Sequence, residues 1–119
     1  RSAGHVLLAY KAKEVRAVIL KSVLAADPYI FSRAKLNNDK FESVIRETRA
    51  QGFAITKVLG VNWATLSVPL KINGNVDFAL SNRFHPTATA LEDATDRFLE
   101  PLKACAQIIA DALKSIRHA

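Results

Sequence analysis

Apolar and polar residues repeat with two different periods along the chain, and the period changes at Gly52. Before Gly52, apolar side chains recur three and four positions apart, which is the spacing of one helical face. After it, the segments Trp63–Leu70 and Val76–Phe84 alternate apolar with polar residues, as strands with one buried face do. From Leu91 onward the helical period returns. The pattern predicts an α+β fold with helices first, then a short sheet, then one long helix.

Two helices are expected ahead of residue 28. The first runs from Ser2 to Tyr10 with Ser2 as its cap, and the second runs from Glu14 to Ala26, ending at Asp27-Pro28. The apolar face of the second helix is predicted to consist of Val15, Val18, Ile19 and Ala26. Residues 28–38 are expected to form a connection with a short extended piece at 34–36.

Two capping boxes predict the starts of the remaining helices. Asp39 and Glu42 open a third helix, which ends before Gly52 because glycine enters the left-handed conformation cheaply. Thr89 and Glu92 open the last helix, which is expected to reach about Arg117. Its apolar stripe is predicted to consist of Leu91, Thr95, Phe98, Leu102, Cys105, Ile109, Leu113 and Ile116. Cys105 is the single cysteine, so no internal disulfide forms, and its place in the stripe predicts a buried, inert thiol.

Between these helices the sequence predicts a short strand at Phe53–Thr56 and a β-hairpin formed by the two longer segments. Asn73-Gly74 separates those segments, and this pair favours a two-residue turn because both positions tolerate positive φ. Each long strand has one apolar face, which suits packing against a helix. The opposite, mixed face carries Trp63, Thr65, Ser67, Asp77, Ala79, Ser81 and Arg83. A mixed face of this kind is either open to water or lines a pocket.

Composition and length fit one folded domain covering residues 1–119. Half of the residues are apolar and 24% are charged, which is ordinary for a globular protein and unlike a disordered one. No apolar run approaches the roughly 20 residues that a membrane helix requires, and the first residues do not resemble a signal peptide. We therefore expect a soluble, cytoplasmic protein without a membrane partner.

The net charge of +6 comes entirely from the first half of the chain. Residues 1–57 hold 11 Lys and Arg against 5 Asp and Glu, whereas residues 58–119 hold 6 of each. The basic residues are scattered among acidic ones, with no cluster and no interleaved aromatic residues. A solvated surface is therefore favoured over direct binding of nucleic acid.

No set of residues has catalytic or metal-binding spacing. The histidines, His5, His85 and His118, fall in three different elements without a cysteine or carboxylate at ligand spacing, and no glycine-rich phosphate loop is present. We therefore expect that the protein binds neither a cofactor nor a metal and that it is not an enzyme.

The remaining candidate for chemistry is the mixed sheet face. Trp63 suits stacking on a flat ligand, and Arg83 suits holding a carboxylate through two parallel hydrogen bonds. The hydroxyl groups of Thr56, Thr65 and Ser81 would add further hydrogen bonds. On the residues alone, an equally good interpretation makes Trp63 a core residue and Arg83 a solvated residue at a sheet edge.

The order of several short motifs resembles the C-terminal effector-binding domain of IclR-type transcription regulators. The first motif is Ser2-Ala3-Gly4-His5-Val6-Leu7-Leu8-Ala9-Tyr10, followed by Leu36, Ile45-Arg46 and Arg49-Ala50-Gln51-Gly52-Phe53-Ala54. Leu66-Ser67-Val68-Pro69-Leu70, Gly74-Asn75-Val76 and Ala79-Leu80-Ser81 come next. The last helix, with Leu91-Glu92, Ala94, Arg97-Phe98-Leu99, Pro101-Leu102 and Ile108-Ile109, is similar to the branch that regulates aromatic-acid catabolism. The resemblance runs in order from Ser2 to about Leu113.

The resemblance implies a GAF-like domain with a curved antiparallel sheet, helices behind it and a ligand pocket in front. By position, the implied ligand-binding residues are Ser2, Ala3, Thr56, Trp63, Thr65, Ser81 and Arg83. The implied partners are a small carboxylate effector, with an aromatic acid favoured over an aliphatic oxo-acid, and DNA, bound through an N-terminal winged helix-turn-helix domain that these residues do not include. A homodimer or homotetramer is implied as well.

The resemblance also implies that the domain is incomplete at its N-terminal side, with strands ahead of Arg1. One departure concerns the segment after Gly52, where members of the family carry acidic residues and this chain has Ile55-Thr56-Lys57-Val58. An acidic ligand contact is therefore not expected there. The alternative function is a purely structural or dimerisation domain without a small-molecule ligand.

Overall fold

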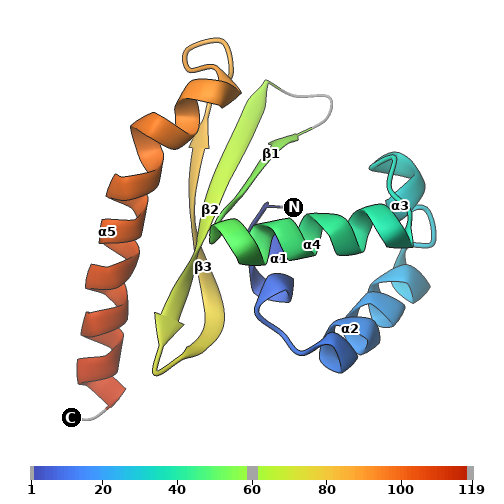
Figure 1. Cartoon of the computed structure of the whole chain (residues 1–119), viewed down its shortest axis with the longest axis horizontal. Coiled ribbons are helices and arrows are strands. Elements are labelled where there is room, and N and C mark those ends of the chain that lie inside the picture. Colours follow the sequence, from blue (N-terminus) through green and yellow to red (C-terminus); the bar gives the residue numbers. More distant parts are fainter. Residues whose placement is uncertain (1, 59–61, 118–119) are drawn as a thin grey trace.

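A three-stranded antiparallel sheet separates two layers of helices in the computed structural model, which describes residues 2–58 and 62–117 (Figure 1). One long helix lies along one face of the sheet, and the other helices lie on the opposite side. The elements in chain order are α1 (Ser2–Ala9), α2 (Lys13–Ala26), α3 (Ile30–Arg33), α4 (Asn38–Gln51), β1 (Ala54–Val58), β2 (Trp63–Ile72), β3 (Asn75–Phe84) and α5 (Leu91–Arg117). The predicted α+β class and the order of helices and strands are confirmed.

The central strand β2 pairs with both of its neighbours. β1 pairs with the first half of β2, from Trp63 to Ser67, and β3 pairs with almost its full length. The hairpin between β2 and β3 turns at Asn73 and Gly74, whose φ angles of 53° and 80° are those that the sequence predicted for this pair. A register shift opposite Leu70 and Lys71 leaves one additional residue on β3.

The apolar face of the sheet packs against α5. Ala64, Leu66 and Val68 of β2 are buried against Ala94, Leu99 and Ala106 of α5, with Phe84 of β3 in the same cluster. A second cluster near the hairpin turn joins Leu70 and Ile72 to Ala110. The sheet and α5 thus form one continuous apolar layer along the length of the helix.

The predicted stripe of α5 is only partly correct: Phe98, Leu102 and Leu113 pack against the core clusters. Leu91, Cys105, Ile109 and Ile116 are exposed, and the fully buried positions include three alanines, Ala94, Ala106 and Ala110. Alanine allows a helix to approach a sheet closely. The prediction considered the larger side chains, so it missed the alanine positions that face the sheet. The prediction of a buried thiol at Cys105 is wrong for the same reason.

On the other side of the sheet, α1 and α4 form a smaller core. Ala9 of α1 packs against Phe41 and Ile45 of α4, and Phe31 and Leu36 border this cluster. The inner face of α4 buries Phe41, Ile45 and Thr48, which recur at helical spacing. Gly52 ends α4 with φ +83°, as the sequence predicted.

Several local predictions about helix caps and one connection are wrong. The cap of α4 is Asn37, whose side chain accepts a hydrogen bond from the backbone of Lys40, so the capping box at Asp39 does not form. Residues 28–38 contain α3 instead of an extended piece. Two hydroxyl groups predicted as caps are used elsewhere: that of Ser2 bonds to Ser67, and that of Thr89 accepts from Arg97.

The helix α2 buries none of its residues. Val15 and Val18, predicted on its inner face, are exposed, as is Ala26, and Ile19 is half-buried. Arg16 and Leu20 face the rest of the molecule instead. Hydrophobic spacing located this helix correctly but not its orientation.

Within the described ranges, no helix combines the length and the apolar character needed to cross a membrane.

We predict opposite effects for two glycine-to-alanine substitutions. Gly52→Ala should lower the free energy of unfolding by about 1–2 kcal/mol, because a Cβ disfavours the left-handed conformation. Gly4→Ala is the matched control: Gly4 lies inside α1 with open space around its Cα, so alanine should stabilise the helix by about 0.5–1 kcal/mol. Urea unfolding of both variants measures the difference. Equal effects at the two positions would contradict the assigned end of α4.

Candidate functional site

The mixed face of the sheet presents its side chains in two rows that cross all three strands. In the first row Thr56 lies opposite Thr65, and Thr65 lies opposite Arg83. The next row places Ser67 opposite Ser81. Since neighbouring strands lie about 4.8 Å apart, the backbones of the outer members of a row are about 10 Å apart. The sheet thus brings together four of the predicted site residues, which are Thr56, Thr65, Ser81 and Arg83.

Three hydroxyl groups connect α1 to this face. The Oγ atoms of Ser2 and Ser67 are 2.7 Å apart, and those of Ser67 and Ser81 are also 2.7 Å apart. Ser2 and Ser67 are completely buried, whereas Ser81 is exposed. The outer end of this chain of hydrogen bonds is therefore accessible to a ligand. Ala3 follows Ser2 on α1 and is half-buried.

Trp63 and Arg83 lie side by side near the open end of the face. The Arg83 guanidinium carbon is 5.7 Å from the centre of the Trp63 ring, within the range of a cation–π contact. The ring of His85 lies 4.0 Å from the same indole, and its Nδ1 is hydrogen-bonded to the backbone oxygen of Asn62. Trp63 is 36% exposed, so it is not a core residue. Arg83 is exposed and forms none of the ion pairs among the described residues.

Two buried polar atoms on this side of the molecule have no hydrogen-bond partner. They are Oγ1 of Thr56, in the first row, and Nδ1 of His5, on α1. His5 packs edge-on against Phe41, with ring centres 6.5 Å apart, and burial lowers the pKa of its imidazole. A buried polar atom without a partner costs about 1–3 kcal/mol. A ligand group that reached Thr56 would remove part of that cost.

Ser67, His5 and His85 were not among the predicted site residues. Strand alternation placed Ser67 on the correct face, and its central position became evident only when α1 was seen to cover it. His85 follows the end of β3, where no periodic pattern indicates the direction of a side chain. The partner of Trp63 therefore had no signal in the sequence.

The mixed face is exposed at Trp63, Ser81 and Arg83, whereas α1 covers it at Ser67. One hollow lies between α1, α2 and α4 and another beside Tyr10, Pro69 and Lys103, and none of the seven predicted residues lines either of these two. In the described part of the chain, no group of three or more His, Cys, Asp or Glu residues is placed to hold a metal ion. Hydroxyl groups, one guanidinium and one indole are what this face offers a ligand.

Comparison with solved structures identifies the fold. A putative transcriptional regulator from Rhodococcus sp. RHA1 matches 97% of this chain with a TM-score of 0.76 and 19% identity. An IclR transcriptional regulator from Alicyclobacillus acidocaldarius matches 92% with a TM-score of 0.73 and 22% identity. The inducer-binding domain of an Acinetobacter PobR transcription factor, a double mutant in complex with 3-hydroxybenzoic acid, matches 92% with a TM-score of 0.73 and 18% identity.

These matches confirm that the chain has the fold of the effector-binding domain of IclR-type regulators, which the sequence motifs resemble. The chain spans 46%, 44% and 63% of the three matched structures, respectively. No family model and no curated protein sequence matches it.

The hydroxyl chain generates a prediction about stability. Ser67→Ala should lower the free energy of unfolding by about 1–3 kcal/mol, because it leaves the buried hydroxyl of Ser2 without a partner. Ser81→Ala is the control, since it removes only the exposed end of the chain and should cost well under half as much. Chemical denaturation of both variants measures the difference. Equal losses would argue against a role of Ser67 in holding α1 on the sheet.

Proposed function

We propose that the chain is the effector-binding domain of a cytoplasmic transcription regulator, and that its mixed face binds a small carboxylate. The observation that carries this proposal is the row Thr56–Thr65–Arg83, with Ser81 and Trp63 beside it, on an α+β fold shared with inducer-binding domains. The fold alone does not specify a ligand. The side chains of the row supply the chemistry.

Arg83 is the proposed anchor for the carboxylate. Its guanidinium forms no ion pair among the described residues and lies beside an indole, which leaves its planar donors free for two parallel hydrogen bonds. The exposed hydroxyl of Ser81 and the half-buried hydroxyl of Thr65 lie within the same two rows. These hydroxyl groups would donate further hydrogen bonds to the carboxylate oxygens.

An aromatic acid is favoured over an aliphatic one. Trp63 provides a flat apolar surface next to Arg83. The unpartnered hydroxyl of Thr56 lies at the opposite end of the row. Across the strands, the backbone of Thr56 is about 10 Å from that of Arg83. A rigid ring with a carboxylate at one end and a second polar group at the other would span this row. The 3-hydroxybenzoic acid bound by the PobR domain has an aromatic ring, a carboxylate and a second polar group, its hydroxyl.

We further propose that additional chain completes the domain and carries the DNA-binding part. Ligand sites usually bury most of the ligand surface, whereas the mixed face is exposed at Trp63, Ser81 and Arg83. β3 is an edge strand ten residues long, and an unpaired edge of that length suits pairing with another strand. The matched regulators are longer than this chain. A strand beside β3 would extend the face and form a wall for the ligand.

In this proposal, the ligand affects DNA binding through α1. Ser2 connects α1 to the sheet at the edge of the site, so a ligand beside Ser81 changes the contacts that hold this helix. Coupling requires only that the ligand bind one arrangement of the domain more tightly than another.

The ligand site makes a direct prediction. The measurement uses the longest natural polypeptide that contains these residues. One class of aromatic carboxylates should raise its melting temperature. Its stabilisation should be about 2.7 kcal/mol at a hundred times the dissociation constant. Arg83→Ala should weaken binding by at least about tenfold, because a charge-assisted hydrogen bond contributes about 1.5–3 kcal/mol. Thermal unfolding against a panel of aromatic and aliphatic acids measures both effects.

Lys57→Ala is the matched control, since Lys57 is exposed on β1 and faces away from the mixed face. It removes one positive charge and should leave binding unchanged. A shift with aliphatic oxo-acids alone would change the ligand class and keep the site. No shift with any acid would favour the alternative function, a structural or dimerisation domain.

The alternative has an observation of its own, which also supports the proposed homodimer or homotetramer. The outer surface of α5 exposes Ile108, Ile109 and Ile116, and Ile108 and Ile116 are each 69% exposed. Large apolar side chains in such a series are typical of a contact between subunits.

Ile108→Glu should therefore lower the oligomeric state, because it places a charge within an apolar contact. Analytical ultracentrifugation at several protein concentrations measures this. Gln107→Glu is the control on the same helix, because this exposed residue lies about 100° around the helix from Ile108, on the side away from Ile109 and Ile116. An unchanged association constant in the Ile108 variant would remove α5 as the subunit contact.

A further inference from the structure

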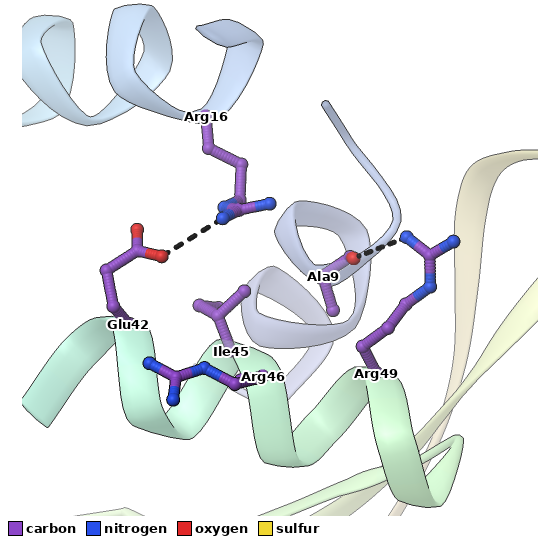
Figure 2. Close-up of a pocket in the computed structure, with 6 residues that line it drawn as sticks. All are labelled: Ala9, Arg16, Glu42, Ile45, Arg46 and Arg49. Carbon is purple, nitrogen blue, oxygen red and sulfur yellow. Dashed lines mark hydrogen bonds and ion pairs between the residues drawn. The ribbon is translucent and has the colours of Figure 1, made fainter. Parts of the chain in front are cut away.

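Three arginines line a hollow on the side of α1 that faces away from the sheet. It has a volume of about 150 Å³ and lies between α1, α2 and α4, as Figure 2 shows. Its lining residues are Ala9, Arg16, Glu42, Ile45, Arg46 and Arg49. A water molecule occupies about 30 Å³ in the liquid, so the hollow has room for a small polyatomic ion.

The charges around the hollow do not balance. Arg16, Arg46 and Arg49 each carry one positive charge, and Glu42 is the single acidic residue of the lining. The residues around the hollow therefore carry a net charge of about +2 at neutral pH. Like charges destabilise one another at short range, and an anion between them would offset this repulsion.

Two of the three arginines also have structural contacts. Arg16 donates through Nη2 to Glu42 at 3.0 Å and through Nη1 to the backbone oxygen of Lys11 at 3.1 Å. Arg49 donates through Nη1 to the backbone oxygen of Ala9 at 3.1 Å, at the end of α1. These bonds position the two guanidinium groups and leave part of their donors unused, since each guanidinium has five N–H groups.

The unused donors point to a missing acceptor. The Nε of Arg16 is buried and has no hydrogen-bond partner. Arg46 forms no hydrogen bond or ion pair within the described ranges, although it lines the same hollow. A buried N–H of a charged group without a partner is costly, and an oxyanion would satisfy it.

We propose that this hollow binds a small dianionic oxyanion, such as inorganic phosphate or a short dicarboxylate, separately from the ligand site on the sheet. Arg16 and Arg49 provide donors that are already oriented, and Arg46 provides the additional charge. The site is distinct from the sheet face because α1 lies between the two.

Binding there would fasten α2 to the rest of the domain. The helix α2 buries no residue, and Arg16 is its ionic connection to α4 through Glu42. An anion that bridges Arg16 on α2 to Arg46 on α4 would add a second connection. The anion would thus control the position of a helix that apolar packing holds only weakly.

The test measures thermal stability in phosphate, in malonate and in sodium chloride of equal ionic strength. We expect phosphate, malonate or both to stabilise the protein more than chloride does, and the more effective anion identifies a phosphoryl or a dicarboxylate ligand. Arg46→Gln should weaken this binding by about tenfold or more, because it removes a charged donor that forms no hydrogen bond or ion pair with the described residues. Lys21→Gln is the matched control, since it removes the same charge from an exposed position on α2.

A second measurement follows the Arg16 Nε–H resonance by nuclear magnetic resonance during the same titration. It should shift in the wild type and in the Arg83→Ala variant, because neither lacks the hollow. The proposal is overturned if phosphate and malonate act no more strongly than chloride. It is also overturned if Arg46→Gln binds as tightly as Lys21→Gln does. Arg83→Ala disables only the sheet site. The proposal of an anion site in the hollow can therefore be tested even if the sheet face binds no ligand.

Discussion

The burial of β2 on both of its faces is the constraint on which the rest of the structure depends. Its apolar positions, Ala64, Leu66 and Val68, pack on α5, and Ser67, which points the other way, is buried under α1. A strand that is buried on both faces cannot shift by one residue, because the shift would bring a hydroxyl into the apolar layer. The register of β1 and β3 is thereby fixed, and so are the two rows of the candidate site.

The two faces of the sheet are held by different forces, and this difference places the polar chemistry. On the α5 side, close packing of alanines against the sheet leaves no room for polar groups. On the α1 side, the contact is a chain of hydroxyl groups from Ser2 to Ser81. Hydrogen bonds are directional, so they orient the short helix, whereas the apolar side contributes most of the burial. The polar side can therefore exchange partners with a ligand without disrupting the core.

The sequence predicted the fold class, the position of each described strand and helix except α3, and the sheet face shared by Thr65, Ser67 and Ser81. Strand alternation succeeded because the side-chain period of two is exact, so Thr65 and Ser67 could be assigned to one face. Helix orientation was wrong in α2 and only partly correct in α5, because alanines and an arginine occupy inner positions beside the large apolar residues. The contact of His85 with Trp63 and the meeting of three arginines depend on tertiary structure, which no local pattern encodes.

The helix α1 links the two candidate sites. Its first residue bonds to the sheet through Ser67, and the carbonyl of its last residue, Ala9, accepts from Arg49 beside the hollow. A helix of eight residues is too short to bend appreciably, so a displacement at one end is transmitted to the other. A carboxylate beside Ser81 and an anion beside Arg49 would thus act on the same rigid element from opposite ends. By linkage, if the affinity of both sites depends on the position of α1, each ligand must change the affinity for the other by the same factor.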